Sequence, residues 1–468
     1  MPELTDAELK KIIARRDPRF DGRFYFGVKT TKIYCRPVCP AKPKPENILI
    51  FKSHSEAEQK GYRPCKRCKP DLFPGQRSID SKYIQVGLAL EIIDASEDFL
   101  SVSEIAQSLR ITTRHLRRLF EEYLGASPIE VINSNRLHLA KKFLTETKRS
   151  VTEIAYAVGY NSLRRFNESF KELYKVTPSQ LRKEYSPRES SVDSIQLEIL
   201  VRKPYDWNYV IHHLDKHLIY GSEIITNGKY LRFIPSSKNQ WGTILVCFDE
   251  QKSILSLECS RLSLSEIKSQ LPKIKKLFDV DHNPNNIPSS RKNDKSMRVP
   301  GCYNSFEIAV SIIIGQLITT KQAKKKVEEL VKKFGERSTG PTSEHDIIFF
   351  PSPAILANAE LEVLGLPKVK ANAIRMLSQQ INQKKLELSY LKDIESTKLK
   401  LLEIKGIGPW TTELIAMRCL GDINAFPSSD LFIRRALNEN MINEEKWQGL
   451  RAYLCHLVWR DLYKELLK

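Results

Sequence analysis

The sequence predicts a multidomain α+β protein of four parts, and three observations lead to that prediction. Two close cysteine pairs stand in the first seventy residues, two similar helical units follow about 49 residues apart, and the second half changes from strand patterning to helical patterning. A chain of 468 residues has room for three or four domains. We place the four parts at residues 1–78, 82–185, 194–290 and 296–468.

The composition favours a nucleic acid as the partner. The 75 lysines and arginines exceed the 56 acidic residues, which gives a formal net charge of +19. No run of about 18 apolar residues occurs, so we expect no membrane span. The five cysteines outside the two pairs are scattered, which is typical of a reducing cytoplasm.

The first part of the chain predicts a zinc site. Cys35 and Cys39 are separated by three residues, and Cys65 and Cys68 by two. Two close pairs joined by a loop supply four thiolates for one tetrahedral Zn²⁺. Short strands are predicted around the first pair, so the metal would brace a small α/β domain. The site could also do chemistry, because a zinc-bound thiolate remains a nucleophile.

The same region also contains a pattern typical of a different zinc site. The strings H-S-E at 54–56 and P-C-K-R-C at 64–68 match the pattern of zinc deaminases. Only seven residues separate the strings, which is too few for the helix and strand that such a site needs. The pattern also leaves the first cysteine pair unused, so we favour the four-cysteine site and expect His54 on the surface.

The second part predicts two helix-turn-helix units in tandem. The string V-S-E-I-A-Q-S-L at 102–109 recurs as V-T-E-I-A-Y-A-V at 151–158, and each is followed by a turn and a basic helix. In such units the second helix carries its polar side chains into the DNA major groove. The arginines expected to contact DNA are Arg114, Arg117, Arg164 and Arg165.

The second half begins with strands and ends with a glycine hairpin. Alternating apolar residues predict strands within 194–285, and the polar run 283–295 is expected to be a mobile loop. Later, Gly406 and Gly408 make a tight turn between two helices, and their backbone N–H groups can hold a DNA phosphate. Asp430 lies 22 residues beyond Gly408. An acid before a helix is also typical of an N-cap, but the hairpin favours a catalytic role.

Residues 1–185 resemble the N-terminal part of the Ada family of bacterial alkylation-response regulators, and residues 85–185 an AraC-type DNA-binding domain. The matching strings are R-D-P at 16–18, D-G at 21–22, Y-C-R-P-V-C at 34–39, E-N at 46–47 and G-Y-R-P-C-K-R-C-K-P-D at 61–71. The resemblance implies that Cys35 is a zinc ligand that also accepts methyl from DNA methyl phosphotriesters, so that the one Zn²⁺ is both structural and catalytic.

The charge of such a site explains how methylation would act as a signal. Zinc with four thiolates carries two net negative charges that repel DNA, and methylation leaves one. The resemblance implies that tighter DNA binding then activates transcription, with RNA polymerase as a partner. Four basic residues near the site are expected to neutralise DNA phosphates, namely Arg36, Arg63, Lys66 and Arg67.

Residues 194–468 resemble AlkA-type 3-methyladenine DNA glycosylases of the helix-hairpin-helix class. Further matching strings are P-Y-D-W at 204–207, L-F-D at 277–279, V-P-G-C at 299–302, I-G-Q-L at 314–317 and L-G-L-P at 364–367. The resemblance implies that Asp430 is catalytic and that Trp410 stacks on a flipped cationic base. It also implies that Leu317, beside Gln316, fills the gap in the DNA stack, and that a monovalent cation binds at the hairpin.

The chain also departs from the family patterns. Bifunctional glycosylases carry a lysine at the position of Trp410, so we expect a monofunctional enzyme without lyase activity. The family's tyrosine four residues later is Leu414, which makes the predicted pocket less aromatic. The nearest match to the second methyl-acceptor motif of Ada proteins, P-C-H-R, is L-C-H-L at 454–457. We therefore expect Cys455 in the core and no direct repair of O6-methylguanine.

Together these patterns predict four domains: a zinc-bound α/β domain, an AraC-type double helix-turn-helix domain, a mixed α+β subdomain and a helix-hairpin-helix glycosylase domain. We expect a monomeric, cytoplasmic, nucleoid-associated bacterial protein that acts on double-stranded DNA. Two alternatives remain open at this point. One is a transcription factor with an inactive glycosylase-like DNA-binding module, and the other is a repair protein with no promoter target.

Overall fold

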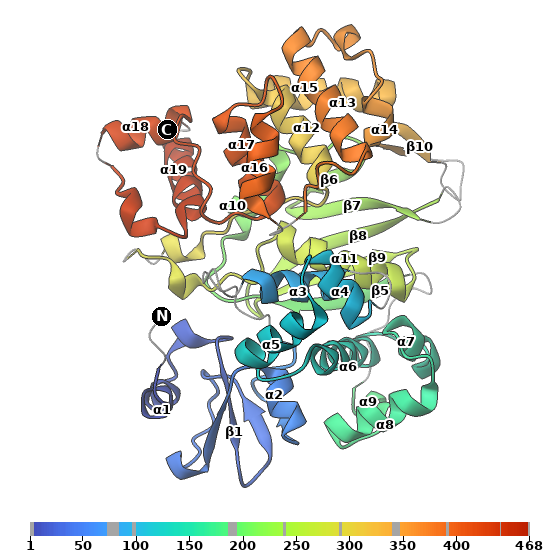
Figure 1. Cartoon of the computed structure of the whole chain (residues 1–468), viewed down its shortest axis with the longest axis vertical. Coiled ribbons are helices and arrows are strands. Elements are labelled where there is room, and N and C mark those ends of the chain that lie inside the picture. Colours follow the sequence, from blue (N-terminus) through green and yellow to red (C-terminus); the bar gives the residue numbers. More distant parts are fainter. Residues whose placement is uncertain are drawn as a thin grey trace.

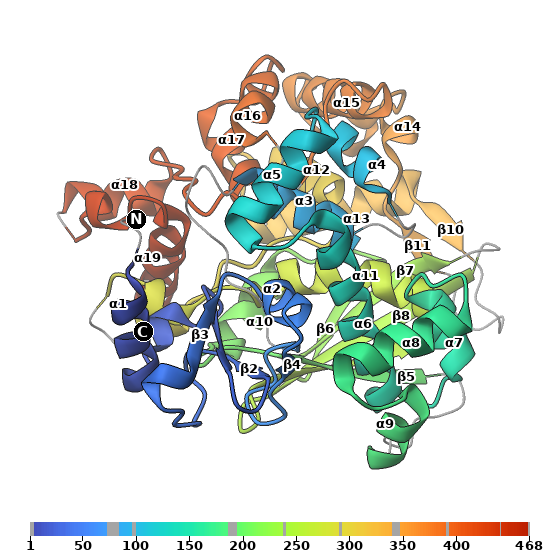
Figure 2. The same cartoon turned by 60° about the horizontal axis from the view of Figure 1, so that its bottom comes forward.

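The fold is described from a computed structural model of the chain (Figures 1 and 2). The described residues are 4–72, 84–95, 100–185, 194–236, 240–289, 293–338, 347–389, 393–439 and 441–466. The boundaries predicted at residues 78, 82 and 290 lie outside them. None of the helices in the described residues is long and apolar enough to cross a membrane.

The zinc-binding part is a four-stranded sheet with two flanking helices, shown in blue in Figure 1. Its strand order is β3-β1-β2-β4. The elements are α1 (Asp6–Arg15), β1 (Tyr25–Val28), β2 (Ile33–Cys35), β3 (Ile48–Phe51), α2 (His54–Gln59) and β4 (Arg63–Pro64). The short β4 pairs parallel to β2, with Tyr34 opposite Pro64. This register brings Cys65, the residue after β4, beside Cys35 at the end of β2.

The second part is helical and contains both predicted helix-turn-helix units. Its helices are α3 (Ile84–Ala95), α4 (Val102–Ser108), α5 (Thr113–Leu124), α6 (Pro128–Glu146), α7 (Val151–Ala157), α8 (Leu163–Tyr174) and α9 (Pro178–Glu184). Each unit starts on a serine N-cap, Ser101 or Ser150, whose hydroxyl accepts a hydrogen bond from a backbone N–H of the first turn. The long helix α6 connects the two units.

The third part is a five-stranded antiparallel sheet with two helices, in the order β5-β9-β8-β7-β6. Its elements are β5 (Ser194–Leu200), α10 (Trp207–Lys216), β6 (Glu223–Thr226), β7 (Lys229–Ser236), β8 (Gln240–Asp249), β9 (Ile254–Ser260) and α11 (Leu264–Leu277). Hydrophobic residues alternate along β5 and β9, so one face of these strands is buried.

The fourth part is a helical body, drawn in orange and red in Figure 1. Its helices are α12 (Ser305–Gly315), α13 (Thr320–Phe334), α14 (Pro353–Leu356), α15 (Lys368–Asn382), α16 (Ile394–Leu402), α17 (Pro409–Ile415), α18 (Leu431–Asn438) and α19 (Arg451–Leu466). A π-helical segment, Ala416–Leu420, continues α17. The four kinds of part agree with the predicted fold class.

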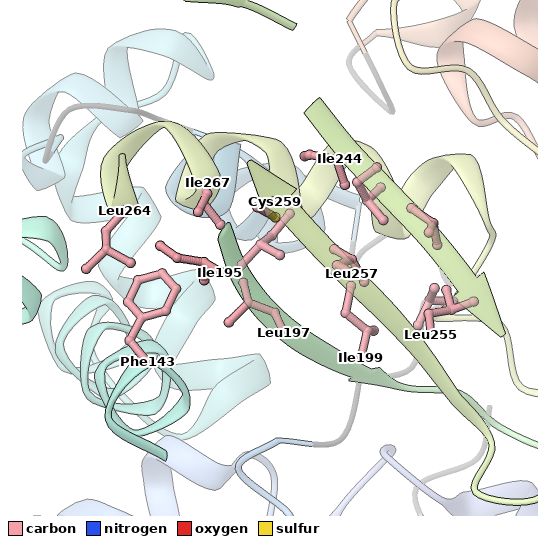
Figure 3. Packing of buried hydrophobic residues seen from close by; sticks show 14 of the residues in the cluster. Phe143, Ile195, Leu197, Ile199, Ile244, Leu255, Leu257, Cys259, Leu264 and Ile267 are labelled. Carbon is pink, nitrogen blue, oxygen red and sulfur yellow. The ribbon is translucent and has the colours of Figure 1, made fainter. Parts of the chain in front are cut away.

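The helix-turn-helix part and the five-stranded sheet share one hydrophobic core (Figure 3). Phe143 of α6 is fully buried and points toward Ile195 and Leu197 of β5. Polar contacts run along the same boundary: the backbone N–H of Glu198 donates to the Glu146 carboxylate at 2.9 Å. The two parts are therefore expected to unfold together.

Replacing Phe143 with alanine tests this coupling. We expect the change to lower the free energy of unfolding by about 3–5 kcal/mol, because it leaves a large cavity in the shared core. Hydrogen exchange followed by mass spectrometry should speed up in peptides from both α6 and β5. The matched variant is Phe120→Ala, since Phe120 is equally buried but packs only within the first helix-turn-helix unit. If Phe120→Ala also speeds exchange in β5, the coupling between α6 and β5 does not depend on the core that Phe143 occupies.

The polar run at 283–295 is not the mobile loop that its composition predicts. Its described residues form two short 3₁₀ turns, Pro284–Asn286 and Asp294–Ser296. Asn283 is 1% exposed and its amide donates to the Pro18 carbonyl at 3.1 Å. Asp294 pairs with Arg460 of α19 at 2.8 Å. The prediction was wrong because the zinc-binding part and α19 pack against this segment and satisfy its polar groups.

Candidate functional site

The four predicted cysteines converge in the zinc-binding part. Their sulfur atoms lie within 4.8 Å of one another. Cys35, Cys39 and Cys65 are buried and Cys68 is partly exposed. The hydrogen bond between Cys39 and Cys35 lowers the pKa of Cys39 to about 7, and the same contact raises the pKa of Cys35. Four sulfurs this close together are a donor set that fits one tetrahedral zinc ion.

The basic residues predicted around the quartet lie in different environments. Arg36 is nearly buried, pairs with Asp21 and donates to the Cys68 carbonyl at 3.3 Å. Arg202, from the five-stranded sheet part, donates to the same Asp21 at 3.5 Å. Lys66 is exposed and pairs with an acid of α9, whereas Arg63 is half-buried and Arg67 exposed. Lys66 and Arg67 are thus the exposed members of this set, while Arg36 ties the end of β2 to Asp21 and to the Cys68 carbonyl.

His54 does not join the cysteines. The quartet found among the described residues contains no histidine, and His54 instead contacts Ser134 of α6 at 3.1 Å. Burial lowers the pKa of His54 to about 4. The deaminase interpretation is therefore excluded, and the expectation of a surface histidine was wrong because the helix-turn-helix part covers this side of α2.

The two recognition helices present their arginines to solvent. Arg114 and Arg117 on α5 are exposed, as are Arg164 and Arg165 on α8. The opposite faces of the helices are buried through Leu116 and Phe120 on α5, and Phe166 and Phe170 on α8. This division places positive charge outward on both helices, as reading of a DNA groove requires.

The predicted hairpin joins α16 to α17. Gly406 has φ +101°, and a side chain there would clash with Val369 of α15. Gly408 meets open space among the described residues, so a ligand backbone can approach it closely. The Gln316 amide donates to the Gly406 carbonyl at 2.9 Å and to the Thr411 hydroxyl at 2.8 Å. Gln316 therefore ties the end of α12 to the hairpin.

Leu317 follows directly after Gln316 and stands out from the surface. It is 101% exposed and has φ +57°, a left-handed conformation that is uncommon outside glycine. Leu317 is therefore not a core residue. The Lys370 ammonium donates to the Ile314 carbonyl at 3.0 Å and so stabilises this turn. The sequence analysis did not single out Lys370.

Asp430 is held by four hydrogen-bond donors at the start of α18. Its Oδ1 accepts from the backbone N–H groups of Phe432 and Ile433 at 3.1 and 3.3 Å, so it is also the N-cap of the helix. The Trp459 indole N–H donates to Oδ1 at 3.1 Å and that of Trp410 to Oδ2 at 3.4 Å. The carboxylate is thus fixed in place between two indole rings.

Trp459 is the residue that the sequence analysis missed. It lies on α19, 29 positions after Asp430, and α19 carries no motif that marks it. Leu414, at the position of the missing tyrosine, packs against the core, whereas Trp459 places an aromatic ring beside Asp430. Cys455 on the same helix is fully buried, which confirms it as a core residue.

Comparison with known proteins agrees with this division into parts. Family models match three segments: the metal binding domain of Ada at residues 8–71, a helix-turn-helix domain at 105–184 and the AlkA N-terminal domain at 196–304. The chain is 29% identical over 484 residues to the "probable bifunctional transcriptional activator/DNA repair enzyme AlkA" of Mycobacterium tuberculosis, covering 97% of this chain and 95% of that protein.

Two further relatives each match one half. The chain is 33% identical over 181 residues to the "bifunctional transcriptional activator/DNA repair enzyme AdaA" of Bacillus subtilis, covering 38% of this chain and 83% of the relative. It is 26% identical over 269 residues to "DNA-3-methyladenine glycosylase 2" of Escherichia coli, covering 55% and 94%.

A four-thiolate cluster, two outward-facing recognition helices and a glycine hairpin with a fixed carboxylate define a class: a regulator joined to a DNA glycosylase. The comparisons then make the assignment specific. The chain belongs to the Ada family, with an AlkA-type glycosylase fused behind its Ada-type N-terminal half.

Proposed function

We propose that this chain repairs alkylated DNA in two ways and reports the damage to transcription. The observation that carries the proposal is Asp430, fixed between two indole N–H groups in a chain that also holds a four-thiolate cluster. The first activity accepts methyl from phosphotriesters and the second removes alkylated bases. Both act on double-stranded DNA of the bacterial cytoplasm.

In the first activity the Cys35 sulfur attacks the methyl carbon of a methyl phosphotriester. An S–C bond forms, the O–CH₃ bond breaks with its electron pair on oxygen, and the triester becomes an anionic diester. Zn²⁺, when bound by the quartet, keeps the sulfur deprotonated and nucleophilic at neutral pH. The Cys35 thiolate ends as a thioether, so each chain reacts once.

The methylated chain then binds DNA more tightly. Loss of one negative charge at the quartet weakens its repulsion of phosphates, and Lys66 and Arg67 lie next to Cys65 and Cys68 to contact them. The exposed arginines of α5 and α8 read the promoter, and RNA polymerase is the partner that responds. This sequence of events couples chemical damage to transcription through charge.

In the second activity an alkylated nucleotide flips out of the duplex, and the exposed Leu317 fills its place. Water adds at C1′ and gives up one proton to solvent, the C1′–N bond breaks with its electron pair on nitrogen, and the base, cationic through alkylation, leaves as a neutral molecule. The Asp430 carboxylate stabilises the positive charge that develops on the sugar. Trp410 carries no amine that could form a Schiff base, so the enzyme is monofunctional. The proposal also includes a monovalent cation that binds at the hairpin of Gly406 and Gly408.

Trp459 is expected to set the position of Asp430. In Trp459→Phe the ring remains but the N–H bond to Asp430 is lost, and we expect base excision to slow about tenfold, the effect of one hydrogen bond to a charged group. Single-turnover assays on 3-methyladenine DNA measure this rate. Trp459→Leu should slow excision further, because it also removes the aromatic ring beside Asp430. An unchanged rate in Trp459→Phe would show that the backbone N–H groups alone hold the carboxylate.

One experiment tests both activities. The purified full-length chain is incubated with methylated double-stranded DNA, the protein is mapped by mass spectrometry, released bases are assayed, and promoter affinity is measured before and after the treatment. We expect one methyl on Cys35 and free 3-methyladenine. Methyl uptake without base release would support instead a transcription factor whose second half only grips DNA. Base release without any change in promoter affinity would support a repair protein with no regulatory role.

A further inference from the structure

A second cluster of metal-ligating side chains lies between the zinc-binding part and the helix-turn-helix part. His54 and Glu58 stand one turn apart on α2, and His138 comes from α6, which packs against α2. One ligand atom from each of these residues lies within 4.8 Å of the others. The two histidine rings have centroids 4.8 Å apart. Neither the quartet nor the glycosylase pocket uses these residues.

Further hydrogen bonds orient the carboxylate of this cluster. Glu58 Oε1 accepts from the Tyr34 hydroxyl at 2.7 Å and contacts His138 Nε2 at 2.7 Å. Glu58 Oε2 accepts from the Ser134 hydroxyl at 2.5 Å. Carboxylates that bind metals are commonly held by such outer partners, which fix the direction of their lone pairs. The side chains of Glu58 and His138 are 7% and 10% exposed, so bulk water competes little for a bound ion.

We propose that His54, Glu58 and His138 form a second divalent metal site, which fastens the methyl-acceptor domain to the AraC-type domain. Two imidazoles and one carboxylate are a donor set for zinc, with a fourth position open to water. Ligands of a tetrahedral zinc ion are about 3.3 Å apart, so the Glu58–His138 contact must open by about 0.6 Å.

The surrounding interface holds the two domains in the required arrangement without the metal. The Ser53 hydroxyl donates to the Leu124 carbonyl at 2.6 Å, and Lys52 donates to the Glu122 carbonyl at 2.9 Å. Asp71 and Lys141 form a second ion pair across the same boundary. The ligands are therefore already placed, and a bound ion adds a link that depends on metal concentration.

Metal counting on the full-length chain tests the proposal, which is independent of the repair activities. After equilibration with zinc and removal of free ion, we expect two zinc ions per chain in the natural protein. His138→Leu should retain one, held by the cysteine quartet. The matched control is Asp71→Asn, which breaks an ion pair at the same interface without removing a ligand and should retain two.

Cobalt substitution separates the two sites by their spectra. The quartet gives thiolate-to-cobalt charge-transfer absorption, and the second equivalent should add only ligand-field bands because its donors are nitrogen and oxygen. One ion per chain in the natural protein would overturn the proposal and leave a hydrogen-bonded ion pair between Glu58 and His138. A second ion that persists in His138→Leu would overturn it too. If that variant does not fold, the natural protein's stoichiometry and cobalt spectrum still decide.

Discussion

Replacing Asp430 with asparagine is expected to lower the rate of base excision by at least about 100-fold. The change removes the negative charge that stabilises the developing cationic sugar, and electrostatic groups of this kind contribute about 10²–10³-fold to rate. Single-turnover release of 3-methyladenine from duplex DNA measures the effect.

The substitution keeps the helix cap but removes the second acceptor oxygen, which accepts a hydrogen bond from the Trp410 indole N–H at 3.4 Å. Asparagine caps helices as well as aspartate does, so its side-chain oxygen can still accept from the N–H groups of Phe432 and Ile433. The melting temperature and DNA affinity should therefore change little. Asp422→Asn is the matched control, since Asp422 pairs with Lys398 of α16 at 2.7 Å and is not among the hydrogen-bond partners of Asp430. If both variants lose excision activity equally, the effect comes from removing any negative charge in this region and not from Asp430 in particular. Full activity in Asp430→Asn would contradict the proposed mechanism.

Replacing Cys35 with serine is expected to abolish methyl uptake from phosphotriester DNA. A hydroxyl at neutral pH is a far weaker nucleophile than a metal-bound thiolate, and the remaining three thiols occupy ligand positions only. Intact-mass measurement after incubation with methylated DNA should show no added methyl group. Promoter affinity should then fail to rise after the same treatment, while base excision continues because Asp430 is unaffected.

The control for this experiment is a cysteine outside the quartet. Cys247→Ser changes a partly exposed thiol on β8 and should leave methyl uptake intact. Zinc content should be measured for both variants, so that loss of the metal is distinguished from loss of the nucleophile. Undiminished uptake in Cys35→Ser would point to another acceptor, and peptide mapping would identify it.

The main features of the fold and of both sites could be predicted from sequence because each depends on local spacing. Each cysteine pair, the repeated helix-turn-helix strings and the Gly-x-Gly turn are short patterns whose geometry is set within a few residues, whereas the pairing of β2 with β4 brings the two cysteine pairs together. The structure brings the quartet together, exposes Leu317 and places Asp430 at the start of a helix. For Asp430, the N-cap and the candidate catalytic group turned out to be the same carboxylate.

Contacts between distant segments could not be predicted in this way. Arg36 follows Cys35 directly, which suggested a phosphate contact, yet it pairs with Asp21 beside Arg202. The polar run 283–295 suggested mobility, yet Asn283 and Asp294 find partners in other domains. In each case the deciding partner lies far away in the sequence and carries no motif.

The sequence by itself determined which chemical groups this protein carries: four thiolates at metal-binding spacing, two basic recognition helices, and a carboxylate after a glycine hairpin. Only the tertiary structure decided how these groups are joined. It brought the Trp459 indole into hydrogen-bond distance of Asp430 and packed α6 against the five-stranded sheet. It also placed His138 next to His54 and Glu58. The physical reason is that spacing along a helix or turn is encoded locally, whereas burial and ion pairing between domains depend on which surfaces meet.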